Sequence, residues 1–147
     1  MQTLDITKIY SVKEQQEQYT RILKESEYAD IFSEIEASIE YDDFQFAYLS
    51  QLYTIEEPNP VRLFINEYLY EVLFEAPDHI RRIFGDVPLN LELHHDPEEG
   101  WDELFIIIKT SLSAEKAIEL EKKLFDEWFV HIMPSTKNKL NIIEESV

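Results

Sequence analysis

Two adjacent histidines lie beside carboxylates in the segment ELHHD, Glu92–Asp96, which is the first candidate for metal chemistry in the chain. Imidazole nitrogens and carboxylate oxygens are common ligands of catalytic zinc. Successive side chains of a strand point to opposite faces, so Glu92 and His94 would share a face that His95 does not reach. Asp96 would join that pair only if the strand continued through it. A metal-dependent hydrolase using Glu92, His94 and Asp96 is therefore one hypothesis. The interpretation we prefer is a polar strand end with an Asp-Pro turn and no bound metal or other cofactor.

An acidic turn around a single tryptophan follows these histidines. Trp101 is surrounded in sequence by the carboxylates of Asp96, Glu98, Glu99, Asp102 and Glu103. Tryptophan is frequent at interface hot spots, and an aromatic side chain among carboxylates suits a basic groove. Alternatively, Trp101 folds back onto the sheet beside a solvated turn. We take this turn as a candidate partner-binding surface.

A second acidic stretch lies earlier in the chain, where no lysine or arginine occurs between Glu25 and Val61. Its candidate partner-binding residues are Glu34, Glu36, Glu40, Asp42 and Asp43. Such a run is usually a solvated face, but it can also form a ridge that mimics nucleic-acid phosphates in a basic groove. Spacing alone does not choose between these two interpretations.

Charge and composition narrow the function classes. The chain has 31 acidic and 13 basic residues, a net charge of −18. This charge disfavours direct binding to nucleic acid or to anionic membranes and favours a basic protein partner. The absence of cysteine removes disulfides and thiol nucleophiles and fits a reducing compartment. No glycine-rich phosphate loop, G-x-S-x-G or H-E-x-x-H motif is present, so we expect a binding protein rather than an enzyme.

The first residues, MQTLDITKIYSVKEQ, lack the basic and apolar regions of a secretory signal peptide. The most apolar helical stretch, Leu63–Phe74, contains Asn66, Glu67 and Glu71 and is shorter than the roughly 20 residues that a spanning helix needs. We therefore expect a cytoplasmic protein.

Helices are predicted for the first half. Ser11–Glu14 has the form of a capping box, which predicts a helix from Val12 to Glu25. A second helical pattern covers Asp30–Tyr41. The segment Asp42–Tyr53 fits a strand or a helix, and we favour a helix because Asp42 or Asp43 is a suitable N-cap.

The segment Pro60–Glu75 is predicted to form a helix that is apolar around most of its circumference, which is typical of a core helix. Alternatively, one flank is a homodimer interface, as in a structural accessory subunit. Ala76–Pro77 is expected to end this helix. A short helix, Asp78–Phe84, follows and ends before Gly85 in a left-handed C-cap.

The C-terminal part is predicted to contain a hairpin of strands Val87–His95 and Leu104–Thr110, whose turn uses Asp96–Pro97 and Gly100. Ser113 would cap a helix over Ala114–Val130, and a last strand would follow at Leu140–Ile143. The fold class expected is α+β, with a helical N-terminal half packed with a C-terminal β-β-α-β antiparallel three-stranded sheet. Residues 1–147 would form one domain, with a helical part at 1–76 and a helix-turn plus β-β-α-β part at 77–147.

The segment Asp86–Trp128 contains the hairpin LELHHDPEEGWDELFIIIKT and a helix that opens SAEKAIELEKKLFDEW. It resembles a family of small acidic prokaryotic proteins that share a strand, a D-P-E-x-G turn, an apolar strand and an acidic helix. This resemblance implies a prokaryotic accessory protein, and no activity or functional residue accompanies it.

The leading hypothesis is thus a non-enzymatic, cytoplasmic interaction protein that binds and regulates or neutralises a basic protein partner. An antitoxin, immunity protein or inhibitor acts in this way, in some cases by nucleic-acid mimicry. The alternatives are the metal-dependent hydrolase and the structural dimeric accessory subunit described above.

Overall fold

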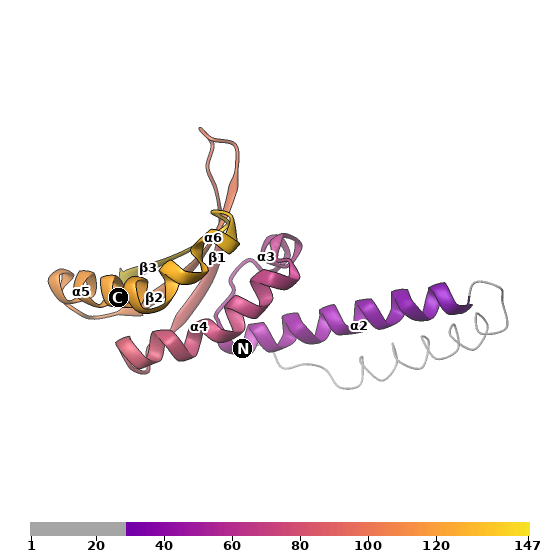
Figure 1. Ribbon diagram of the computed structural model, residues 1–147, viewed down its shortest axis with the longest axis horizontal. Helices are drawn as coiled ribbons and strands as arrows, with labels where there is room; N and C mark the ends of the chain where they lie inside the picture. The colour runs from indigo at the N-terminus through magenta and orange to yellow at the C-terminus, as the bar shows by residue number, and fades with distance from the viewer. Residues whose placement is uncertain (1–28) are drawn as a thin grey trace. The chain divides into compact units, whose positions relative to one another are not determined.

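The computed structural model describes residues 29–147, so the helix expected at Val12–Glu25 lies outside the described residues. The chain divides into two compact units, Met1–Phe44 and Gln45–Val147, and each is described by itself. No helix within residues 29–147 is long and apolar enough to cross a membrane. Figure 1 shows the elements along the chain.

Helix α2 (Ala29–Leu52) joins two segments that were predicted separately. The ambiguous segment Asp42–Tyr53 is therefore helical through Leu52, as favoured. Neither Asp42 nor Asp43 begins a new helix, because the sequence from Ala29 to Leu52 contains no glycine or proline to interrupt the one already formed.

Two helices, α3 (Pro58–Phe64) and α4 (Glu67–Phe84), replace the single helix predicted at Pro60–Glu75, which is therefore wrong in its bounds. The new helix begins after Asn66, whose side chain accepts a hydrogen bond from the N–H of Leu69 at 2.9 Å. Asparagine is among the strongest N-cap residues because its side-chain oxygen satisfies a free helix donor. The helix then runs to Phe84. Gly85 follows with a φ of +82°, which has the predicted sign, but its ψ of −164° is not that of the predicted left-handed C-cap.

Pro77 lies inside α4 instead of ending a helix, so the predicted break at Ala76–Pro77 is wrong. A proline inside a helix cannot donate to the carbonyl four residues earlier, which here belongs to Leu73. The hydroxyl of Tyr53 donates to that carbonyl at 2.6 Å. Burial raises the pKa of the Tyr53 phenol, against a smaller opposing effect of the Arg81 charge, so the hydroxyl keeps its proton. A side chain from another segment thus supplies the donor that Pro77 lacks.

The predicted hairpin is confirmed. Strands β1 (Leu89–His95) and β2 (Asp102–Thr110) pair antiparallel, with Leu91 opposite Ile106. The sheet order is β1-β2-β3, which makes β2 the central strand. Ile106 and Ile108 on the core face of β2 and Ile107 on its other face are each at most 1% exposed. An uninterrupted apolar run is typical of a strand buried in this way.

The third strand, β3 (Leu140–Ser146), runs parallel to β2, with Leu140 beside Leu104 and Ser146 beside Thr110. The sheet is therefore mixed, and the expected antiparallel arrangement is wrong for this strand. The helical segment between the two strands is about 35 Å long at 1.5 Å per residue. Strand β2 is about 30 Å long at 3.3 Å per residue. The helices return the chain along the whole of β2, so β3 starts at the end where β2 starts, as parallel neighbours require.

That helical segment consists of α5 (Ala114–Leu124), a π-helical turn η1 (Phe125–Phe129) and α6 (Val130–Thr136). The predicted cap is confirmed, because the side chain of Ser113 accepts a hydrogen bond from the N–H of Lys116 at 3.2 Å. The segment continues beyond the predicted end at Val130. It stops at Lys137 and Asn138, which both have positive φ.

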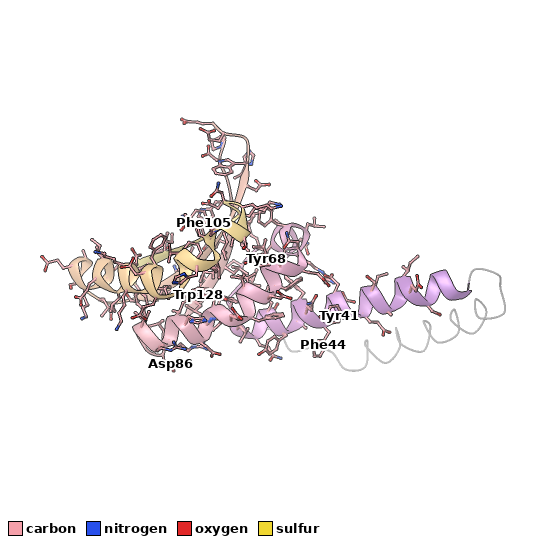
Figure 2. The ribbon with its side chains drawn as sticks, viewed as in Figure 1. Tyr41, Phe44, Tyr68, Asp86, Phe105 and Trp128 are labelled. Carbon is pink, nitrogen blue, oxygen red and sulfur yellow. The ribbon has the colours of Figure 1, made fainter. Side chains whose placement is uncertain are left out.

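The core of the second unit lies between helices and one face of the sheet. Leu91, Ile106 and Leu140 belong to this core together with residues of α4 and of η1. Trp128, labelled in Figure 2, is 7% exposed and stacks on the ring of His79 from α4 at 4.6 Å. The α+β class is thus confirmed, with helices covering one face of a three-stranded sheet.

Candidate partner-binding site on the β1–β2 hairpin

The turn between β1 and β2 is closed by its own backbone. The N–H of Asp96 donates to the carbonyl of Trp101, and the N–H of Gly100 donates to the carbonyl of Asp96, both at 2.8 Å. Gly100 has a φ of +74°, as predicted, and a side chain at such a φ would strain the backbone. These bonds hold the acidic residues of the turn in one arrangement.

The carboxylate of Asp96 accepts hydrogen bonds from the backbone of the turn. Its Oδ1 accepts the N–H of Glu98 at 2.8 Å and that of Glu99 at 3.1 Å. The bond from Glu99, followed by that from Glu98, lowers the pKa of Asp96 below its ordinary value, because both stabilise the ionised form. Asp96 therefore acts as an anionic cap of the turn and does not continue the strand.

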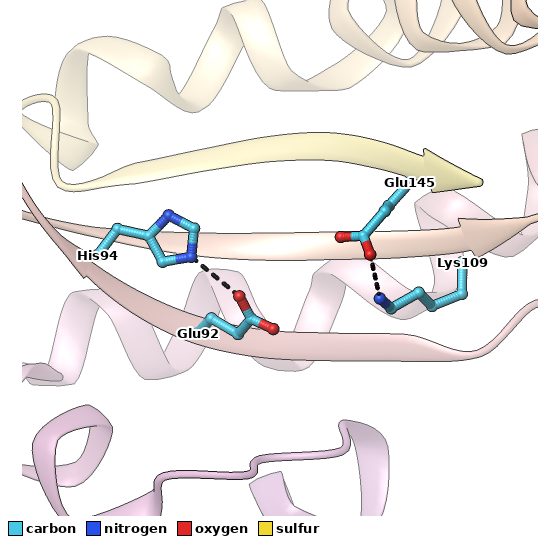
Figure 3. Close-up of polar contacts among 4 residues, drawn as sticks. All are labelled: Glu92, His94, Lys109 and Glu145. Carbon is cyan, nitrogen blue, oxygen red and sulfur yellow. Dashed lines mark hydrogen bonds and ion pairs between the residues drawn. The ribbon is translucent and has the colours of Figure 1, made fainter. Parts of the chain in front are cut away.

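The two histidines use different faces, as predicted. His94 Nε2 lies 2.9 Å from Glu92 Oε2, and the His94 ring packs 4.5 Å from the ring of Phe105. His95 Nδ1 lies 2.7 Å from Asp102 Oδ1. Figure 3 shows the Glu92–His94 contact beside the ion pair of Lys109 and Glu145.

The proposed metal ligands are only partly brought together. Glu92 and His94 meet, whereas the carboxylate of Asp96 binds the turn. Within residues 29–147, no group of three or more His, Asp or Glu side chains is placed to hold a metal ion.

The turn and the last two residue pairs of the hairpin extend beyond the third strand. The pairing of β3 begins at Leu104, so the pairs His94–Glu103 and His95–Asp102 and the turn between them form a two-stranded ribbon. This ribbon projects from the sheet in Figure 1. Trp101 is 45% exposed at its end. The carboxylates Glu98, Glu99 and Asp102 are also exposed, and Glu103 is half-buried.

The negative charge of the turn is not neutralised by basic residues of the described chain. The sequence contains no lysine or arginine between Arg82 and Lys109. In the part of the chain that the structure describes, the turn's carboxylates form no ion pair with lysine or arginine, and Asp102 pairs with His95 alone. The turn therefore presents a concentrated negative potential around an aromatic side chain.

The second predicted surface lies on α2, in the first unit. The side chain of Glu36 lies outside the described residues. Glu40 and Asp43 occupy positions i and i+3, which share one face of a helix, and Glu34 and Asp42 lie on another side. Glu34, Glu40 and Asp43 are exposed, and Asp42 is half-buried. These four carboxylates are thus divided between two sides of α2.

A pocket along the outer edge of β1 was not predicted. It has a volume of about 260 Å³ and is lined by Glu56, Glu57, Pro60, Leu91, Glu92, Leu93 and His94. Thr54 bridges to Asn90, which brings the segment of Glu56 and Glu57 beside β1. The one sequence signal was that both glutamates belong to the stretch without lysine or arginine.

The chain matches no protein-family model, and comparisons with curated proteins and with solved structures give no match. The resemblance of Asp86–Trp128 to small acidic prokaryotic proteins therefore stays a prediction.

Proposed function

We propose that this chain is a non-enzymatic, cytoplasmic interaction protein that binds and regulates or neutralises a basic protein partner. The observation that carries the proposal is Trp101, which is 45% exposed at the end of a projecting ribbon. It lies among carboxylates that meet no lysine or arginine of the described chain.

Each part of this arrangement has a role in association. Uncompensated charge draws an oppositely charged partner and raises the association rate. The indole offers a large rigid side chain, of the kind that dominates interface hot spots. The Asp96 cap orders the turn before binding, so less conformational entropy is lost when the complex forms.

A basic groove that normally holds nucleic acid is one kind of surface that such a turn fits. Carboxylates on a rigid ribbon can occupy the positions of phosphates. Antitoxins, immunity proteins and inhibitors of nucleases or regulators would act in this way, and the acidic surface of α2 would add to the attraction. The net charge of −18 supports this class of partner.

The experiment measures binding of the purified full chain to basic proteins encoded by neighbouring genes, at low and at high ionic strength. A partner that binds through these charges is retained at low salt and released at high salt. Trp101→Ala should weaken binding of that partner by about 2 kcal/mol, which is roughly a 30-fold rise in Kd.

A matched pair of double variants, each lacking two negative charges, tests whether the position of the charge matters. Glu98→Gln with Glu99→Gln should slow association, whereas Asp126→Asn with Glu127→Gln, which neutralises two exposed carboxylates of η1, should not. Retention of no basic protein even at low salt, or equal binding by the turn variants and the wild type, would contradict the proposal.

A further inference from the structure

The two edges of the sheet are protected to different extents. On β3, the outward N–H groups of Ile142 and Glu144 donate to side-chain oxygens, to Asn141 Oδ1 at 2.8 Å and to Glu121 Oε1 at 2.6 Å. An edge strand with free amides is a template for another strand, and proteins usually cover such edges. Side chains thus satisfy the two central outward amides of the β3 edge.

Backbone hydrogen bonds cover the β1 edge only at its start. The N–H of Thr54 donates to the carbonyl of Leu89 at 2.9 Å, and the N–H of Leu91 donates to the carbonyl of Thr54 at 3.0 Å. Backbone groups of successive residues alternate between the two sides of a strand. The amides of Leu93 and His95 therefore also point outward, away from β2. Among the described residues, none accepts a hydrogen bond from either amide.

The pocket of about 260 Å³ lies along this uncovered part of β1. Its lining includes three carboxylates, those of Glu56, Glu57 and Glu92, and no lysine or arginine. Leu91 and Leu93 line it from the face of the sheet that belongs to the core, and Glu92 and His94 line it from the other face. An incoming strand would thus find free backbone amides, an apolar side and an acidic side.

We infer that the outer edge of β1, from Leu91 to His95, takes up an extended basic segment of a partner as a fourth strand. This inference rests on the proposed function and names the form in which the partner binds. Side chains of neighbouring strands contact on the same face, so apolar residues of the guest would lie beside Leu91 and Leu93. Its basic residues would lie beside Glu92. The guest is therefore a segment in which lysine or arginine alternates with apolar residues, bound by main-chain hydrogen bonds.

The probe is a capped, fluorescent peptide of alternating lysine and valine, Lys-Val-Lys-Val-Lys-Val-Lys. Its control has the central valine replaced by proline, which keeps the charge but interrupts a strand. Both are titrated against the full chain at low ionic strength by fluorescence anisotropy. The alternating peptide should bind roughly tenfold more tightly, because the control loses backbone hydrogen bonds.

Amide hydrogen exchange measured by NMR locates the contact. Saturating peptide should protect the amides of Leu93 and His95, whereas those of Glu92 and His94, which face β2, should change little. His95→Pro removes one outward N–H and leaves the bonds to β2 in place, so it should weaken the alternating peptide and not the control. Glu56→Gln with Glu57→Gln should weaken both peptides, and Asp126→Asn with Glu127→Gln neither.

Three outcomes would overturn the inference. Equal binding of the two peptides, without protection of Leu93 and His95, would leave a charge-driven partner but no added strand. Absence of peptide binding would also remove the inference, while the proposed function would still be decided by the turn variants. Protection of these amides that rises with protein concentration alone would assign the edge to a second copy of the chain.

Discussion

Replacing Tyr53 with phenylalanine would remove one buried hydroxyl and leave the aromatic ring in place. The hydroxyl donates to the carbonyl of Leu73 at 2.6 Å, the carbonyl that Pro77 leaves without its helical donor. A buried acceptor that loses its donor costs about 1–3 kcal/mol. We therefore expect Tyr53→Phe to lower the free energy of unfolding by about 2 kcal/mol.

The reasoning is tested by restoring the helical donor. In Pro77→Ala, the new backbone N–H at this position can donate to the carbonyl of Leu73. The Tyr53 hydroxyl is then no longer the sole donor to this carbonyl. Tyr53→Phe should then cost about 1 kcal/mol or less, which gives a coupling free energy of at least about 1 kcal/mol between the two positions. Urea unfolding of the four proteins, followed by far-UV circular dichroism, measures this cycle.

Tyr48 provides the matched control. It is 45% exposed and its ring contacts Phe74 at 5.1 Å. Removal of its hydroxyl, in Tyr48→Phe, should change the free energy of unfolding by less than about 0.5 kcal/mol. Equal costs of Tyr53→Phe in the wild-type and Pro77→Ala backgrounds would refute the replacement of the missing donor by the hydroxyl.

The same hydroxyl predicts the response to alkaline pH. Burial raises the pKa of Tyr53 in the folded state, so the unfolded chain releases this proton first as the pH rises. Stability is then fully present below the unfolded pKa of about 10 and is lost above it. The wild type should lose more stability than Tyr53→Phe when the pH is raised through this range, and parallel losses in urea unfolding would contradict the prediction.

Three further changes test local elements. Asn66→Ala removes the cap bond to Leu69 and should cost about 1 kcal/mol by urea unfolding, whereas Asn66→Asp should cost much less. Gly100→Ala places a side chain at a φ of +74° and should cost about 1–2 kcal/mol, with a smaller cost for Gly100→Asn. Because the pKa of Asp96 is lowered in the folded state, its stabilisation is present above the ordinary value of about 3.9 and is lost as the pH falls through the folded pKa. The amide shift of Glu98 in NMR spectra should report that loss, and Asp96→Ala should abolish the transition.

Local patterns predicted the hairpin and its turn well. The alternation of Leu89, Leu91 and Leu93 with polar residues, the Asp-Pro pair and the glycine at a positive φ all act over a few residues, so their effect is present in the sequence itself. The same holds for the Ser113 cap, which is one side-chain bond to an amide three residues later. The partition of His94 and His95 between two faces also follows from strand geometry alone.

Elements whose limits depend on distant residues were predicted wrongly. Pro77 locally indicates a helix end, whereas the hydroxyl of Tyr53, from another segment, satisfies the carbonyl that Pro77 leaves without a donor. The direction of β3 depends on the length of the helical segment before it and on where that segment docks. Neither contact has a signal in the residues immediately around it.

Some features of the candidate site likewise depend on local sequence, and others depend on contacts between distant segments. The charge of the turn, its tryptophan and its backbone conformation can be read from the chain, because they depend on composition and on bonds within a few residues. The position of Glu56 and Glu57 beside β1, and the free edge that Leu93 and His95 face, arise from the folded arrangement of distant segments. That arrangement depends on the bridge between Thr54 and Asn90, a pairing of segments far apart in the chain. Such a pairing is chosen by the packing of the whole core and not by either segment.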